Sequence, residues 1–210
     1  GYALAPITEF DGEPVTMKIG LSFVSTDNAA ENLEHEIGDA SFEDIHAAAQ
    51  ERWSELLSKL EVSGGTPKQQ EMFYSSLYRA FLWPALRSDV NGEFRNANGE
   101  IESADYRYYT DPSFWDTYRN KLVLLTLMEP EVTTDIIKSL INKGEKTGFI
   151  PNFFHGDHAQ PFIAGAYLRG LRDFDVEKAY EILLQNAYTV GGIRPHLDEY
   201  MEKGFVSDLR

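Results

Sequence analysis

Trp115 and Asp116 are neighbours in a run of residue types that can bind a sugar. The run from Tyr108 to Arg119, YYTDPSFWDTYR, holds five aromatic side chains, two acids and one arginine. An indole face covers the apolar C–H groups of a sugar ring, and a carboxylate accepts hydrogen bonds from its hydroxyls. The pairing of Trp115 with Asp116 is therefore compatible with a carbohydrate-binding site, with Arg119 one helical turn further on.

The same run has a purely structural interpretation. Asp111 or Ser113 can cap a helix that begins after Pro112, and Asp116 in the first turn would interact favourably with the helix dipole. Asp116 and Arg119 also have the i,i+3 spacing of an ion pair. Residue chemistry alone leaves both interpretations open.

A second polar cluster lies in the loop from Gly148 to Ala159, GFIPNFFHGDHA. Its three members, His155, Asp157 and His158, fall within four residues and could ligate a metal. They lack the i,i+4 histidine spacing of helical metal sites, and Asp157 can instead cap the helix that follows. Two phenylalanines flank the cluster. This favours contact with a substrate over a transition-metal site.

The composition excludes several classes of partner. The 210 residues carry 19 basic and 34 acidic side chains, for a formal charge of −15. Such a surface repels phosphate backbones, which argues against nucleic acid and anionic membranes as partners. No apolar run approaches the roughly 20 residues of a membrane span. The absence of cysteine rules out disulfides, thiolate metal sites and thiol nucleophiles.

The segments that must position these residues are mainly helical. Period-3.6 patterns and capping residues predict helices over residues 26–36, 42–60, 67–83, 113–128, 159–171, 176–187 and 196–203, and one more from Pro130 to Gly144 or Gly148. The turn dipeptide Asn98-Gly99 predicts a short β-hairpin between strands at 93–95 and 101–109. The mostly short loops between helices favour antiparallel neighbours.

The first 25 residues have a different pattern. Apolar and polar residues alternate from Val15 to Phe23, which is typical of a strand with one buried face. The dipeptide Asp11-Gly12 predicts a hairpin with residues 2–10 as its other strand. Because two strands alone are marginally stable in water, they require a larger sheet. We therefore expect two domains, of which the first is incomplete.

Several strings in this chain resemble glycoside hydrolase family 92, the α-mannosidases. FWDTYR at 114–119 resembles the family's Trp-Asp-Thr-Tyr/Phe-Arg motif, and YYTD at 108–111 resembles the approach to it. The other similar strings are GDHA at 156–159, IGLSFVS at 19–25, FD at 174–175 and KAYE at 178–181. The resemblance extends in order over nearly the whole chain. In one departure, Pro151 leads to Asn152-Phe153-Phe154, where members carry a longer stretch with Arg-Trp.

The resemblance implies a fold and a domain division. Members have an N-terminal β-sandwich followed by an (α/α)6 toroid of helical hairpins, with the active site between them. On this basis residues 1–25 would be the last strands of the sandwich. Residues 26–210 would be the N-terminal part of the toroid, which makes the fold class mainly α.

The resemblance also implies an activity. Members are secreted or periplasmic, calcium-dependent, inverting exo-α-mannosidases that remove terminal α-linked mannose from glycans. By resemblance, Trp115 and Asp116 line the subsite of the cleaved mannose. Arg119, Asp157 and His158 are further substrate-binding candidates, in the pocket or directly behind it.

The catalytic carboxylates of the family are not expected in this segment. The general acid Glu and general base Asp come from motifs that would follow residue 210, so no catalytic residue and no calcium ligand is assigned here. We expect the isolated segment to be inactive, and the rest of the polypeptide or a second chain to complete the toroid. A non-catalytic glycan-binding module, or a toroid of another glycosidase or a lyase, remains the alternative.

Overall fold

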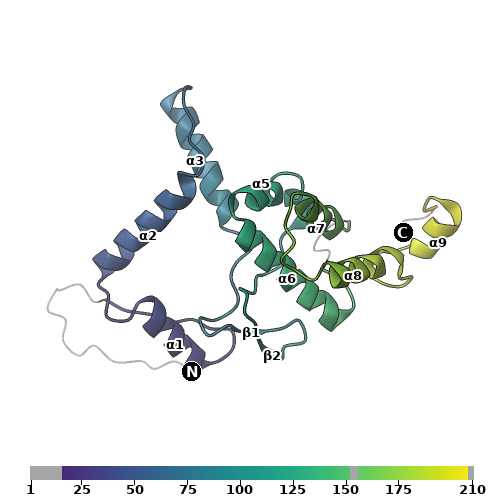
Figure 1. Cartoon of the computed structure of the whole chain (residues 1–210), viewed down its shortest axis with the longest axis horizontal. Coiled ribbons are helices and arrows are strands. Elements are labelled where there is room, and N and C mark those ends of the chain that lie inside the picture. Colours follow the sequence, from purple (N-terminus) through teal and green to yellow (C-terminus); the bar gives the residue numbers. More distant parts are fainter. Residues whose placement is uncertain (1–15, 152–155, 208–210) are drawn as a thin grey trace.

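Helices dominate the computed structural model, which describes residues 16–151 and 156–207 (Figure 1). Within those residues the elements are α1 Thr26–Glu36, α2 Phe42–Leu57, α3 Pro67–Phe81, β1 Glu93–Arg95, β2 Ile101–Ser103, α4 Phe114–Thr117, α5 Lys121–Met128, α6 Pro130–Thr147, α7 Ala159–Leu168, α8 Val176–Tyr188 and α9 Leu197–Lys203. The mainly helical fold class predicted from the sequence is confirmed. The structure places no described helix that is both long and apolar enough to cross a membrane.

Helix starts follow the capping residues of the sequence. The Ser25 hydroxyl accepts a hydrogen bond from the Asn28 backbone N–H at 3.0 Å and begins α1. Ser41 with Asp44, and Thr66 with Gln69, form reciprocal capping boxes at the starts of α2 and α3. The predicted starts at Ser41 and Thr66 are confirmed, and of the two possible caps of α1, Ser25 and Asp27, the structure uses Ser25.

One predicted helix is divided in two. The helix expected from Ser113 to Met128 breaks into α4 and α5 around Asn120, whose backbone has φ −127° and ψ −74°. The Asn120 side chain accepts a hydrogen bond from the Lys121 backbone N–H at 2.6 Å. Asparagine side chains compete with helical backbone hydrogen bonds in this way and favour helix starts over helix interiors.

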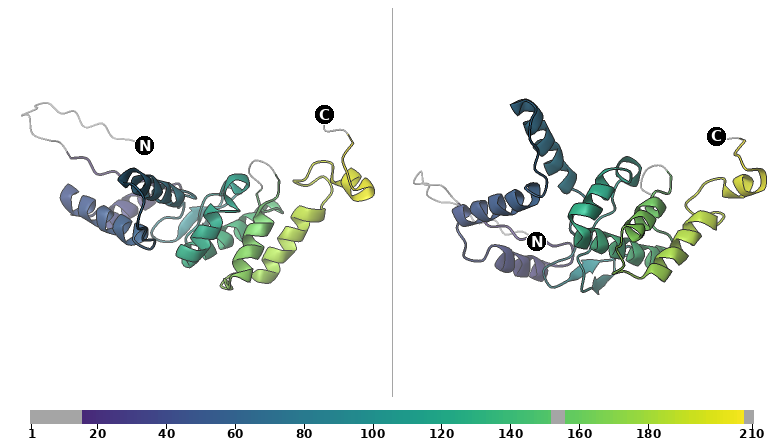
Figure 2. Two further views of the ribbon diagram at one scale, coloured as in Figure 1. Left: turned by 90° about the horizontal axis from the view of Figure 1, so that it is seen from above. Right: turned by 45° about the horizontal axis from the view of Figure 1, so that its top comes forward.

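The core lies among α5, α6, α7 and α8, which pack side by side in both views of Figure 2. Four of its fully buried aliphatic side chains come from α5, α6 and the segment after α6: Leu122, Ile137, Leu140 and Ile150. Phe162 and Ala166 from α7 and Ala179 and Ile182 from α8 complete this core. By contrast, α2 and α3 extend away from it (Figure 1).

Gly144 on α6 allows α8 to approach closely. A β-carbon at this position would lie 2.7 Å from Ile182 Cγ2 and 3.2 Å from Ile150 Cγ1. We expect Gly144→Val to lower the free energy of unfolding by about 1–3 kcal/mol, the usual cost of overpacking a core. Glu145→Ala, at the exposed neighbouring position, is the control, with an expected change within about 0.5 kcal/mol. Equal urea midpoints for the two variants would contradict close α6–α8 packing.

The β-hairpin forms as predicted but is shorter. Strands β1 and β2 pair antiparallel with Phe94 opposite Glu102, and β2 ends at Ser103 instead of continuing to Tyr109. Tyr109 forms an isolated bridge with Leu86 instead. Behind the hairpin the ring of Phe94 stacks on Tyr108 with centroids 3.9 Å apart. This contact fixes the segment that leads into α4.

A buried carboxylate connects α1 to the hairpin. Asp89 accepts hydrogen bonds from the side chains of Ser22 at 2.6 Å, Asn28 at 2.9 Å and Asn32 at 2.8 Å. Both asparagines are buried on α1. The network therefore holds the N-terminal helix against the loop that precedes β1.

The predicted strand at the N-terminus is wrong over the residues that can be described. Residues 16–25 contain no strand, and Met17, Ile19, Leu21 and Phe23 are exposed rather than buried. A strand needs a neighbouring strand to satisfy its backbone and cover its apolar face, and no other described segment pairs with residues 16–25. The other predicted strand, at 2–10, lies outside the described residues. The domain division between residues 25 and 26, with a β-sandwich before it and a helical toroid after it, stays a prediction.

Apolar surface remains uncovered beside the core and on the helices that extend away from it. A groove of about 370 Å³ between α7 and α8 is lined by apolar side chains, among them Ile163, Phe174 and Leu183. Phe42 on α2 and Met72 on α3 are also exposed. Contiguous apolar surface of this kind usually marks a contact with another segment or chain.

Candidate functional site

Helix α4 is held in place by its first residue. The Phe114 side chain is buried and lies near Phe162 of α7, with ring centroids 6.0 Å apart. The preceding residues are fixed by the Thr110 backbone N–H, which donates to the Ala85 carbonyl at 2.9 Å. The next two residues of α4, Trp115 and Asp116, are exposed, and Trp115 is 48% accessible. The structure therefore presents the indole and the carboxylate at the surface.

Asp116 makes a different contact from the one predicted. Its Oδ2 accepts a hydrogen bond from the Ser113 hydroxyl at 2.7 Å. Ser113 therefore gives no side-chain cap to the α4 backbone. The expected ion pair with Arg119 is not formed between these described residues, because Arg119 Nε donates to the Tyr118 hydroxyl at 2.7 Å. The structural interpretation of this run is therefore partly confirmed: Ser113 occupies the N-cap position and Asp116 lies in the first turn of α4, but the side-chain cap and the predicted ion pair are not formed.

Tyr118 brings the two predicted clusters together. The His158 ring stacks on Tyr118 with centroids 4.4 Å apart and an angle of 23° between the rings. The Arg119 guanidinium also lies against the Tyr118 ring, 5.0 Å from its centroid. Arg119 and His158, which are 39 positions apart in the sequence, thus share one aromatic neighbour. The sequence analysis placed Tyr118 in the motif but did not single it out as the link.

Asp157 is buried among hydrogen-bond donors. Its carboxylate, 3% exposed, accepts from Arg194 at 3.0 Å, from Gln160 at 3.1 Å and from Asn186 at 3.3 Å. The N-cap of α7 is His158, so the predicted capping role of Asp157 is wrong. The carboxylate instead joins the start of α7 to α8 and to the segment before α9. Of the proposed metal cluster, His155 lies outside the described residues.

Lys143 is a buried cation that the sequence analysis did not identify. Its Nζ donates to the Tyr109 carbonyl at 2.7 Å and pairs with the Asp111 carboxylate. Burial lowers the pKa of Lys143, an effect that the Asp111 charge partly opposes. Burial also raises the pKa of Tyr108, whose ring lies 4.9 Å from Lys143 Nζ. The lysine fixes the residues immediately before α4.

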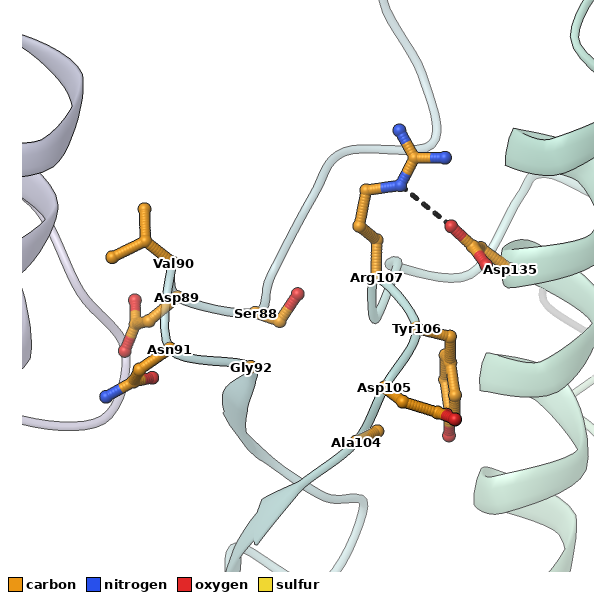
Figure 3. A pocket seen from close by; sticks show the side chains of 10 residues that line it. All are labelled: Ser88, Asp89, Val90, Asn91, Gly92, Ala104, Asp105, Tyr106, Arg107 and Asp135. Atoms are coloured by element: carbon orange, nitrogen blue, oxygen red, sulfur yellow. Dashed lines mark hydrogen bonds and ion pairs between the residues drawn. The ribbon is translucent and has the colours of Figure 1, made fainter.

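Two polar hollows lie near these groups. One, of about 340 Å³, is lined by Asp89, Asp105, Arg107 and Asp135, with six other residues (Figure 3). Its Arg107 Nε donates to Asp135 at 2.7 Å, so Asp135 and Asp89 already have protein partners. The described residues contain no group of three or more metal-ligating side chains. The second hollow, of about 260 Å³, adjoins Asp111, Lys143 and Pro151.

Comparison with known proteins identifies the family. The family model of the glycosyl hydrolase family 92 catalytic domain matches residues 28–209, most of the chain. The chain belongs to glycosyl hydrolase family 92. It is also 28% identical over 178 residues to an uncharacterized secreted glycosidase of Arthroderma benhamiae, which covers 82% of this chain and 20% of that protein.

Solved family 92 structures have the same arrangement of helices. An α-mannosidase from Bacteroides thetaiotaomicron, 31% identical, superposes with a TM-score of 0.79 over 85% of this chain and 25% of its own. An inverting mannosidase of the same organism, 29% identical, gives 0.78 over 88% of this chain and 27% of its own. The family 92 chain therefore spans about a quarter of these solved relatives. Its helices agree with a partial helical toroid.

Proposed function

We propose that this family 92 chain forms part of an inverting, exo-acting α-mannosidase that hydrolyses terminal α-linked mannose from glycans. The observation that carries the proposal is the family match, together with the exposed Trp115 and Asp116 on α4. The first Bacteroides α-mannosidase has also been solved in complex with mannoimidazole, which supports a mannose-containing glycan as the ligand.

Each candidate residue has a proposed role that follows from its contacts. Trp115 covers the apolar face of the terminal mannose, and Asp116 accepts hydrogen bonds from its hydroxyls. Arg119 and His158 complete the wall of the subsite through their shared contact with Tyr118. Asp157 positions the start of α7, where His158 is the N-cap residue, because its carboxylate accepts hydrogen bonds from Gln160 on α7 and from Arg194.

Cleavage requires two more carboxyl groups. An inverting glycosidase places its acid and its base about 6.5–9.5 Å apart, with room for a water between them. We infer that a Glu and an Asp from the rest of the enzyme supply these groups, in the same polypeptide or a second chain. That portion would also cover the apolar groove between α7 and α8.

Because the catalytic carboxyl groups are proposed to lie outside this chain, we predict that the chain and the complete enzyme differ in mannose release. The 210-residue chain alone is expected to release no mannose from α-1,2-, α-1,3- or α-1,6-linked disaccharides. The complete enzyme should release it with β configuration at the new anomeric centre, as followed by NMR. Hydrolysis by the isolated chain would contradict this assignment of roles. Mannoside binding without release by the complete enzyme would instead favour a glycan-binding module.

Calcium is proposed as the cofactor of the complete enzyme. Hard oxygen ligands suit calcium, but the described residues form no ligand group for it, so its ligands are expected elsewhere in the enzyme. A chelator should abolish mannose release, and added calcium should restore it. Full activity after exhaustive chelation would contradict the proposal. Secretion is proposed on the likeness to the fungal secreted glycosidase.

A further inference from the structure

The Lys143 side chain reaches from α6 to the segment that leads into α4. Its Nζ donates to the Tyr109 carbonyl at 2.7 Å, pairs with the Asp111 carboxylate and lies 4.9 Å from the centroid of the Tyr108 ring. The lysine itself is buried. One buried ammonium group therefore interacts with three of the four residues from 108 to 111.

Asp111 is held from two sides. Its carbonyl accepts a hydrogen bond at 3.0 Å from the indole N–H of Trp83, which lies just after α3. Its carboxylate pairs with Lys143, and no second ion pair joins it to any described residue. The next residue, Pro112, is fully buried. The two contacts of Asp111 therefore set the point at which the chain enters α4.

Helix α4 depends on this entry point for its position. It has only four residues, and a helix of one turn has too few hydrogen bonds to hold itself. Its start is connected by side chains, because the Ser113 hydroxyl donates to Asp116 Oδ2 and the Thr117 hydroxyl donates to the Ser113 carbonyl, both at 2.7 Å. A shift of Asp111 should therefore be passed on to Trp115 and Asp116.

The environment of Lys143 makes its charge sensitive to pH. Burial lowers the pKa of Lys143, the Asp111 charge opposes this effect, and the Arg87 charge adds to it. The other ionisable groups nearby are the Tyr108 phenol, Arg95 in the lining of the adjoining hollow, and two carboxylates that accept hydrogen bonds from Asn96 in that lining, Glu100 and Glu102. Lys143 should therefore lose its proton below the ordinary lysine value of 10.5.

We propose that Lys143 is a positioning residue of the mannose subsite. Its positive charge holds the Asp111 carboxylate against α6, and through Asp111 it places Trp115 and Asp116 where they bind a terminal mannose. The identity of the sugar rests on the proposed function, whereas the dependence of α4 on the Lys143 charge does not. A neutral side chain of similar length should lose this effect, and another cation should keep it.

Calorimetric titration of the complete enzyme with methyl α-mannoside tests the proposal. At about pH 7 we expect Lys143→Met to weaken binding about 10-fold, the effect of losing one hydrogen bond from a sugar hydroxyl to the Asp116 carboxylate. Lys143→Arg should recover most of the affinity. Lys138→Met is the control, because it removes the same charge from the same helix, where Lys138 pairs with the exposed Asp173. It should bind as tightly as the wild type.

The pH dependence separates positioning by charge from a purely structural role. Affinity of the wild type and of Lys138→Met should fall as the pH rises toward 10.5, since Lys143 then loses its proton. Arginine stays charged throughout this range, so Lys143→Arg should lack this fall. Lys143→Met should have the lower affinity at every pH.

A measurement without ligand separates this role from the proposed function. Fluorine NMR of the complete enzyme labelled with 5-fluorotryptophan, with the Trp115 signal assigned from Trp115→Phe, should show that signal move over the same pH range in the wild type and not in Lys143→Arg. If it does so in an enzyme that binds no mannoside, the proposed function fails while the dependence of α4 on Lys143 stands.

Three results would overturn the role of Lys143. The first is equal mannoside affinity in Lys143→Met and Lys138→Met. The second is an equal loss of affinity in Lys143→Met and Lys143→Arg, which would exclude positioning by charge. The third is the same alkaline fall in Lys143→Arg as in the wild type, and this comparison remains decisive even if Lys143→Met does not fold.

Discussion

Replacing Asp116 with alanine in the complete enzyme is expected to lower kcat/KM for α-mannosides by about 100-fold. A carboxylate that accepts hydroxyl hydrogen bonds contributes about 1.5–3 kcal/mol, and each 1.36 kcal/mol corresponds to a factor of ten. Asp116 is exposed on α4, and its only hydrogen bond among the described residues is from Ser113 at 2.7 Å. Its loss should therefore affect the substrate far more than the fold.

Asp39→Ala is the matched control for this substitution. Asp39 is likewise exposed, but lies between α1 and α2, away from α4. The control should retain wild-type kcat/KM, and both variants should melt within a few degrees of the wild type. Wild-type kcat/KM in Asp116→Ala would remove Asp116 from the mannose subsite.

The Asp157→Ala substitution is expected to lower the free energy of unfolding by about 3 kcal/mol. The change leaves the Arg194 guanidinium and the buried Asn186 amide without their carboxylate acceptor. Removing one partner of a buried ion pair typically costs 3–5 kcal/mol, and the estimate is at the lower end because the Arg194 side chain is 36% exposed. Urea unfolding followed by circular dichroism measures the change.

Asp173→Ala provides a control in which the same substitution removes an exposed ion pair. Asp173 also pairs with a basic side chain, Lys138 at 2.9 Å, but it is 91% exposed. Exposed ion pairs contribute about 0–1 kcal/mol, so this variant should be close to wild type. Similar losses for the two variants would show that burial of Asp157 does not determine its contribution.

Local features of the fold could be predicted from the sequence. The capping residues Ser25, Ser41 and Thr66 predicted the starts of three helices, since a cap depends on contacts within three residues. The break at Asn120 was missed because no proline or glycine marks it between residues 113 and 128. The N-terminal alternation was misinterpreted because a strand depends on neighbouring strands, and no segment that the structure describes pairs with residues 16–25.

The candidate site was only partly predictable, because several of its contacts join residues that are far apart in the sequence. Trp115, Asp116 and Arg119 belong to one contiguous motif, so their grouping was visible in the sequence. The partners of Asp157 come from Asn186 and Arg194, 29 and 37 positions away, and no local pattern connects them. Lys143 likewise gave no signal, because one lysine in a helix is usually solvated.

A crystal structure of the complete enzyme with mannoimidazole tests the account most directly. The account predicts that the bound ring lies against the indole of Trp115, with an Asp116 oxygen within about 3 Å of a sugar hydroxyl. Mannoimidazole bound with both side chains outside contact distance would contradict it.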